Sequence, residues 1–138
     1  MVSCSQQKPT PTSDVLSKYD VKALMHSGGY TAYNELIYDA EYSFPNLEWL
    51  EKEFYPKYWE FLKSNGYWVY EEESNDCDDF AGEARLFAQR LNNKTENKGK
   101  RALAFGELHY TTDKGGSHAI NFVILKVGDN FKILFFEP

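Results

Sequence analysis

The chain of 138 residues is long enough for one domain, and its composition is that of a folded protein. Hydrophobic residues make up 42% and aromatic residues 17% of it, which excludes wholesale disorder. The net charge of −6 argues against a nucleic acid or an anionic membrane surface as the main partner. No apolar run approaches the roughly 18 residues of a transmembrane helix, so the sequence predicts none.

The N-terminal stretch 1–13 is polar and contains Cys4, one of two cysteines. One interpretation is a disordered leader. The other is a tether after a removed bacterial lipoprotein signal, because Val-Ser-Cys is similar to the end of a lipobox, and Cys4 would then carry a lipid anchor at a cell surface. With either interpretation we expect no disulfide between Cys4 and Cys77 and no zinc site of paired cysteines. Residues 14–138 are predicted to form a single domain.

Helices are predicted throughout the first half of that domain. Asp14 is a candidate N-cap for a helix over 14–26, and 30–41 is a second candidate helix. A longer amphipathic helix is expected after Asn46, bent by Pro56 and ended by Asn65-Gly66. Its expected buried face has three- and four-residue spacing and comprises Leu47, Leu50, Phe54, Tyr58 and Phe61.

A further helix is predicted over about 77–92, and the last third changes to strand-forming composition. The expected buried face of the helix comprises Cys77, Phe80, Ala84, Phe87 and Leu91. Strands are predicted over 102–110, 117–127 and 131–136, with a tight hairpin at Gly128-Asp129-Asn130. Helices followed by an antiparallel β-meander indicate an α+β domain.

Cys77 lies where a nucleophilic thiol is favoured, at the N-terminus of a predicted helix. Unpaired backbone N–H groups and the helix dipole lower a thiol's pKa there and stabilise an oxyanion. The alternative is that Cys77 is a small buried hydrophobic residue. His118 begins one strand of the hairpin and Glu137 ends the other, so the two are expected within two or three residues of facing each other. A carboxylate on one imidazole nitrogen would leave the other nitrogen to take the Cys77 proton.

His109 is the rival base. With a loop at 111–116, residues 110 and 118 should pair, so His109 and His118 would point to opposite faces of the sheet. Only one can face the helix that begins at Cys77, and we favour His118.

The Cys-Asp-Asp-Phe-Ala, His-Ala-Ile-Asn-Phe and Phe-Phe-Glu-Pro segments together resemble papain-like cysteine peptidases. They are most similar to the branch that includes the C-terminal domain of the fungal fairy-ring mushroom agglutinin and its phage and bacterial relatives. The resemblance covers about 68–138. It implies a papain-like fold, with the nucleophile helix packed on the meander, and proteolysis that needs calcium. It also implies that Cys77 is the nucleophile, His118 the base and Glu137 the orienting carboxylate.

Six carboxylates fall within nine residues around Cys77, at Glu71, Glu72, Glu73, Asp76, Asp78 and Asp79. One interpretation is a solvated loop that complements the helix dipole. Nearby negative charges would, however, oppose a thiolate, and a hard cation would remove that conflict. We therefore expect a Ca²⁺ site with Asp78 and Asp79 as the first ligands and Asp76 beside them.

The sequence thus predicts a cysteine hydrolase that forms an acyl-enzyme on a peptide or protein substrate. The Cys77 N–H would supply half of the oxyanion hole, and Asn75 is a candidate for the other half. Trp68 and Tyr70, with Tyr67, would line a substrate cleft or pack in the core. The alternatives are a catalytically silent papain-like binding or structural protein of a phage or bacterial surface, and a cell-wall amidase or transglutaminase-like acyl transferase.

Overall fold

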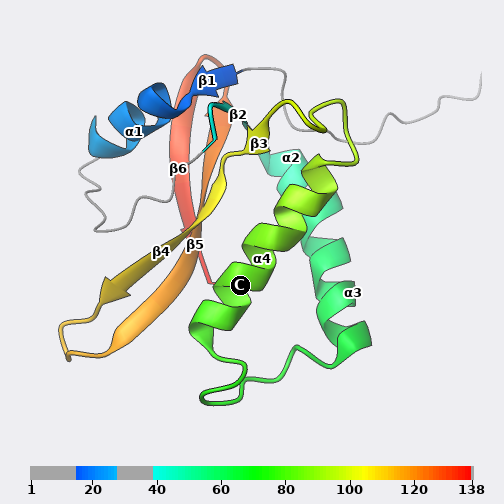
Figure 1. The fold of residues 1–138 in the computed structure, drawn as a ribbon, viewed down its shortest axis with the longest axis vertical. Helices are drawn as coiled ribbons and strands as arrows, with labels where there is room; N and C mark the ends of the chain where they lie inside the picture. Colours follow the sequence, from blue (N-terminus) through cyan, green and yellow to red (C-terminus); the bar gives the residue numbers. More distant parts are fainter. Residues whose placement is uncertain (1–14, 28–38, 138) are drawn as a thin grey trace, which may run out of the picture.

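The computed structural model describes residues 15–27 and 39–137, which form a mixed α/β arrangement with two small sheets (Figure 1). The predicted leader, with Cys4, lies outside these residues. So does most of the predicted helix over 30–41; of its described residues, 39 and 40 are not helical and Glu41 begins a strand. Among the described helices, none is long and apolar enough to cross a membrane. The elements in chain order are β1 (Val15–Ser17), α1 (Lys18–Ser27), β2 (Glu41–Ser43), α2 (Leu47–Trp49), the π-helical segment η1 (Leu50–Phe54), α3 (Tyr55–Asn65), α4 (Cys77–Asn92), β3 (Ala102–Leu103), β4 (Phe105–Thr111), β5 (Ser117–Val127) and β6 (Asn130–Phe136).

Helix α1 begins later than predicted because a different residue caps it. The Ser17 hydroxyl accepts from the Asp20 N–H at 3.2 Å and donates to the Asp20 carboxylate at 2.8 Å. The Asp20 carboxylate also accepts from the Ser17 N–H at 3.3 Å, so the two residues satisfy N–H groups that the first helical turn leaves free. The expected cap, Asp14, lies outside the described residues, and the chain just before the helix forms strand β1.

The long helix runs over 47–65 as one path through α2, η1 and α3. Asn46 caps it as predicted, because its side-chain oxygen accepts from the Trp49 N–H at 2.8 Å. The irregularity expected at Pro56 appears as the π-helical turn just before it, since proline has no N–H to give to the preceding turn. Gly66 ends the helix with a left-handed φ of 73°.

Helix α4 has the predicted bounds, and its predicted buried face is confirmed at Ala84 and Leu91 but extends to Ala81 and Ala88, which were not predicted. The side chains buried against the sheet are small, at Ala81, Ala84 and Ala88, and they allow close approach. Phe80 and Phe87 are half-buried and pack on the hydrophobic cluster shared with α3. Asp76 and Asp79 form a capping box at the helix start.

The predicted meander is confirmed as the antiparallel sheet β4-β5-β6. Tyr110 pairs with His118, as the loop length predicted, and Val127 pairs with Asn130 at the hairpin. The predicted strand 102–110 is divided, because its first two residues join a second sheet of order β1-β2-β3 in which β2 and β3 are parallel. That sheet was not predicted.

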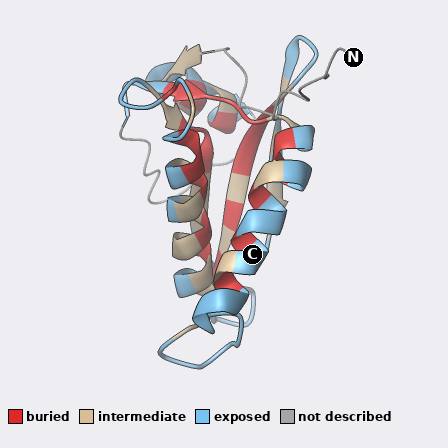
Figure 2. Ribbon diagram, turned by 90° about the vertical axis from the view of Figure 1, so that its right-hand side faces the viewer, coloured by how far each residue is buried: buried red, intermediate tan, exposed pale blue. Residues whose placement is uncertain are grey.

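The meander has an apolar cluster on each face. One face packs on α3 and α4 through Phe105, Val123 and Leu125, and the other packs on α1 through Ile124 and Ile133. Figure 2 shows the buried residues along the inner sides of the helices and strands and the exposed residues outward. This packing leaves the loop between α3 and α4 at one end of the molecule, outside both clusters (Figure 1).

Candidate functional site

The aromatic loop, residues 67–75, joins α3 to α4 and has an ordered backbone. A small turn closes it, because the Glu71 N–H donates to Asn75 O at 3.0 Å and the Asn75 N–H donates to Glu71 O at 2.8 Å. The Asn75 amide then donates to Tyr67 O at 2.9 Å and to Val69 O at 2.6 Å. These bonds hold the loop in one shape without burying it.

Four consecutive apolar side chains point into solvent from this loop. Their exposed fractions are 47% for Tyr67, 54% for Trp68, 43% for Val69 and 62% for Tyr70. Trp68 and Tyr70 therefore do not pack in the core, whereas the Tyr67 ring still lies edge-on to Phe61 at 6.0 Å between centroids. A contiguous exposed apolar group on an ordered loop is typical of an interaction surface. Glu73, in the turn of the same loop, adopts a left-handed φ of 67°, a strain that concentrates at functional sites.

The acidic residues lie beside the aromatic loop at the start of α4. Donor atoms of Asp76, Cys77 and Asp78 all lie within 4.8 Å of one another. The Asp78 side chain, within hydrogen-bond reach of Asp76, raises the pKa of Asp76, and burial adds to this rise. The Asp76 Oδ1 atom is buried without a hydrogen-bond partner. Asp79 Oδ2 instead accepts from the Asp76 N–H at 3.3 Å. Asp76 and Asp78 are thus better placed than Asp79 to share a cation.

His118 and Glu137 meet as the hairpin predicted, with His118 Nε2 2.9 Å from Glu137 Oε1. The His118 ring also lies edge-on to its register partner Tyr110, at 5.5 Å between centroids. Cys77 does not join them: among the described residues no hydrogen bond links its sulfur to either side chain. Figure 1 shows the α4 N-terminus, where Cys77 lies, at the lower end of the helix.

The expectation that His118 faces α4 is wrong. Asn121 on β5 donates to Ala81 O at 2.9 Å, so the odd-numbered residues of β5 face the helix, and His118 lies on the other face. The helix-facing side carries His109, paired with Ala119. His109 Nε2 lies 3.1 Å from Glu107 Oε2, and Glu107 Oε1 binds Arg85 of α4 at 2.6 Å.

Asn75 does not have the place expected of an oxyanion donor. Its amide nitrogen donates to two carbonyls of its own loop. Its role in the structure is to fix the shape of the aromatic loop. The only sequence signal for such a role is an Asn just before a helix, which more often predicts a cap.

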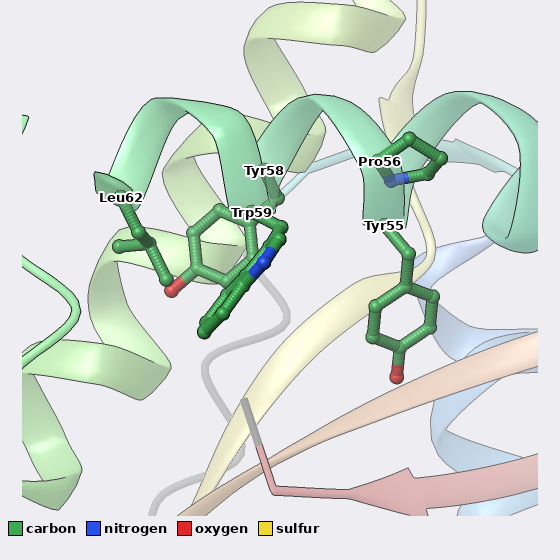
Figure 3. A pocket seen from close by; sticks show the side chains of 5 residues that line it. All are labelled: Tyr55, Pro56, Tyr58, Trp59 and Leu62. Carbon is green, nitrogen blue, oxygen red and sulfur yellow. The ribbon is translucent and has the colours of Figure 1, made fainter. Parts of the chain in front are cut away.

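Two features of the structure were not predicted from the sequence. One is the Arg85–Glu107–His109 network, which requires the strand register to be known. The other is a surface cavity of about 340 Å³ on α3 lined by Tyr55, Pro56, Tyr58, Trp59 and Leu62 (Figure 3). The sequence pattern that could have indicated this cavity is the i, i+4 aromatic pair Tyr55 and Trp59. This pair lies beside the predicted buried face of the helix and not on it.

Comparison with known proteins gives matches by structure only. No protein-family model matches the chain, and no curated protein does. A solved structure described as a PSL1a–E64 complex matches with a TM-score of 0.62 and 20% identity, covering 90% of this chain and 43% of that one. The Polyporus squamosus lectin bound to the epitope Neu5Aca2-6Galb1-4GlcNAc matches with a TM-score of 0.63 and 20% identity, covering 90% and 42%.

These likenesses show a shared fold, and this chain spans less than half of the lectin chains it matches. They overturn the prediction of a papain-like cysteine peptidase, because the structures that share the fold are those of a carbohydrate-binding lectin. The predicted activity as a cysteine hydrolase on a peptide substrate is corrected with it. The roles given to Cys77, His118 and Glu137 stay predictions. The α+β prediction is confirmed at the level of mixed helices and sheets, and the papain-like fold is not confirmed. The chain is thus grouped by its fold with part of a fungal lectin.

Proposed function

We propose that this chain is a binding protein without catalytic activity, that its ligand is a glycan, and that the aromatic loop contacts that ligand. The observation that supports the proposal is the loop itself, which holds four exposed apolar side chains on a hydrogen-bonded backbone. The shared fold with a glycan-binding lectin supports the ligand class.

The chemistry of the loop suits a sugar. The C–H face of a pyranose ring is apolar and packs on an aromatic ring such as Trp68 or Tyr70, while its hydroxyl groups need hydrogen-bond partners. Glu71, Glu72 and Glu73 follow directly and are exposed, and carboxylates are strong acceptors for hydroxyl groups. An ordered loop also loses less conformational entropy when the ligand binds.

The charge of the loop favours a neutral glycan. The epitope bound by the Polyporus squamosus lectin contains Neu5Ac, whose carboxylate is negative at neutral pH. Six carboxylates line residues 71–79 of this chain, so an acidic sugar would bring like charges together. We therefore propose uncharged sugars as the ligands of this loop.

Isothermal titration with glycans identified on an array tests the proposal. Trp68→Ala and Tyr70→Ala should each weaken binding about 5- to 30-fold, because each removes a ring that would contact the sugar. Tyr19→Ala is the matched control, since Tyr19 is 71% exposed on α1, away from the loop. Equal binding by the three variants, or Cys77-dependent turnover of a peptide, would overturn the proposal.

A bound Ca²⁺ ion is proposed beside the loop. The residues present fit it: Asp76 Oδ1 is buried without a partner, and donor atoms of Asp76, Cys77 and Asp78 lie together. Asp76 and Asp78 would supply the protein oxygens, because calcium prefers oxygen to sulfur. The ion would neutralise the two close carboxylates.

Thermal unfolding with CaCl₂ tests the calcium proposal separately from glycan binding. Calcium should raise the unfolding temperature of the wild type and leave Asp76→Asn unaffected. Glu96→Gln, a charge change in the connector after α4, is the control and should respond as the wild type does. An equal shift in all three proteins would show unspecific binding.

A further inference from the structure

The cavity on α3 is a second candidate binding site, distinct from the aromatic loop. All five lining residues come from one face of this helix, with Tyr55, Trp59 and Leu62 about one turn apart. Figure 3 shows the Trp59 indole projecting beside the Tyr58 ring, with Tyr55 further along the helix and an opening between them. Trp59 is 52% exposed and Tyr55 39%, whereas Tyr58 and Leu62 are buried. The cavity therefore has an apolar floor and two exposed aromatic walls.

The lining offers a ligand almost no hydrogen bonds. The Tyr58 hydroxyl already donates to Phe80 O of α4 at 3.2 Å, and Pro56 and Leu62 have apolar side chains. A sugar or a primary ammonium would lose hydrogen bonds to water there without replacement. A ligand with no hydrogen-bond donors of its own would lose none.

Two charged groups act on the aromatic residues of the cavity. The Lys63 ammonium lies 5.9 Å from the centroid of the Trp59 ring, so one face of this indole already attracts a cation within the chain. Burial raises the pKa of Tyr58, and the negative charge of Glu83 on α4 raises it further. The two other lysines nearby, Lys52 and Lys57, are each paired with a glutamate.

We propose that this cavity binds a trimethylammonium group, as found on choline or on a trimethylated lysine. Such a group carries positive charge but no N–H, and it is recognised by aromatic rings. The cavity of about 340 Å³ is at the small end of ligand sites and suits a headgroup of this size. The proposal does not depend on glycan binding at the loop.

An NMR titration of the intact chain with choline tests it, because the three tryptophans report their own positions. The indole N–H signal of Trp59 should shift, whereas those of buried Trp49 and of Trp68 in the aromatic loop should not. The neutral isostere 3,3-dimethylbutanol has the same shape without the charge, and it should bind about 3- to 30-fold more weakly. A trimethyllysine peptide in a parallel titration distinguishes a modified protein from a free small molecule as the source of the group.

Two variants sharpen the result. Trp59→Leu keeps an apolar side chain but removes the ring, so it should abolish the preference for choline over the isostere, and Trp68→Leu should keep it. Lys63→Gln should strengthen choline binding, because it frees the indole face and removes a like charge. A Trp59 signal that does not move, or equal binding of choline and its isostere to the wild type, would overturn the proposal.

Discussion

Replacing Asn75 with alanine separates the shape of the aromatic loop from its contacts. The variant removes two hydrogen bonds, from the side-chain amide to Tyr67 O and Val69 O, and leaves every aromatic ring in place. A side-chain hydrogen bond contributes about 0.5–1.5 kcal/mol net, and these two are at the surface, so the ordered loop should lose about 1–2 kcal/mol. A ligand that needs the ordered loop would then bind about 5- to 30-fold more weakly.

Global stability should change little in this variant. The loop lies outside both hydrophobic clusters, so it can open without unfolding the domain. Two measurements are needed: titration calorimetry with a neutral glycan, and amide hydrogen exchange over 67–75. Ser74→Ala is the control, since the Ser74 hydroxyl makes only a long 3.3 Å contact to Glu71. Faster exchange in the loop with unchanged glycan affinity would refute the claim that loop order matters for binding.

Three further variants test the fold. Gly106→Ala should destabilise the domain by about 1–3 kcal/mol in urea unfolding, because the new Cβ would come within 2.5 Å of the Phe122 ring; no loss would contradict this packing. Gly66→Ala, at φ 73° with open space around it, should lower the free energy of unfolding by about 1 kcal/mol through backbone strain alone, and an unchanged value would contradict the left-handed cap. Burial raises the pKa of Glu107, but its bonds to Arg85 and His109 outweigh this and lower the pKa overall, so its stabilisation is present above its unfolded pKa and is lost as pH falls through the folded value. Arg85→Met should therefore be less stable than wild type at pH 7, with the difference shrinking at pH 3, and an equal deficit at both would contradict the ion pair.

Local features of the fold could be predicted from the sequence where one residue type decides them. Asn46 and Gly66 mark the ends of the long helix because a capping side chain and a left-handed φ are local requirements. The 110–118 pairing followed from loop length alone. The parallel contact of β2 with β3 could not be predicted, because it joins segments about 60 residues apart through a sheet with few residues.

The candidate site was harder to predict, because its geometry depends on tertiary packing. Pairing of Tyr110 with His118 was correct, yet it leaves two choices for the face that meets α4. The bond from Asn121 to Ala81 O shows which face meets α4, and the small side chains Ala81, Ala84 and Ala88 let the helix lie close to it. His118 was expected to face the helix and meet Cys77. It lies instead on the other face of the sheet, where it meets Glu137.

We propose that this chain binds a sugar and does not cleave a substrate. A single protein sample given both a panel of neutral and sialylated glycans and a fluorogenic peptide, with calcium present, tests this directly. We expect saturable binding of a neutral glycan, weaker binding of its sialylated counterpart, loss of binding in Trp68→Ala, and no peptide turnover. Peptide cleavage that disappears in Cys77→Ala, with no glycan bound, would contradict it.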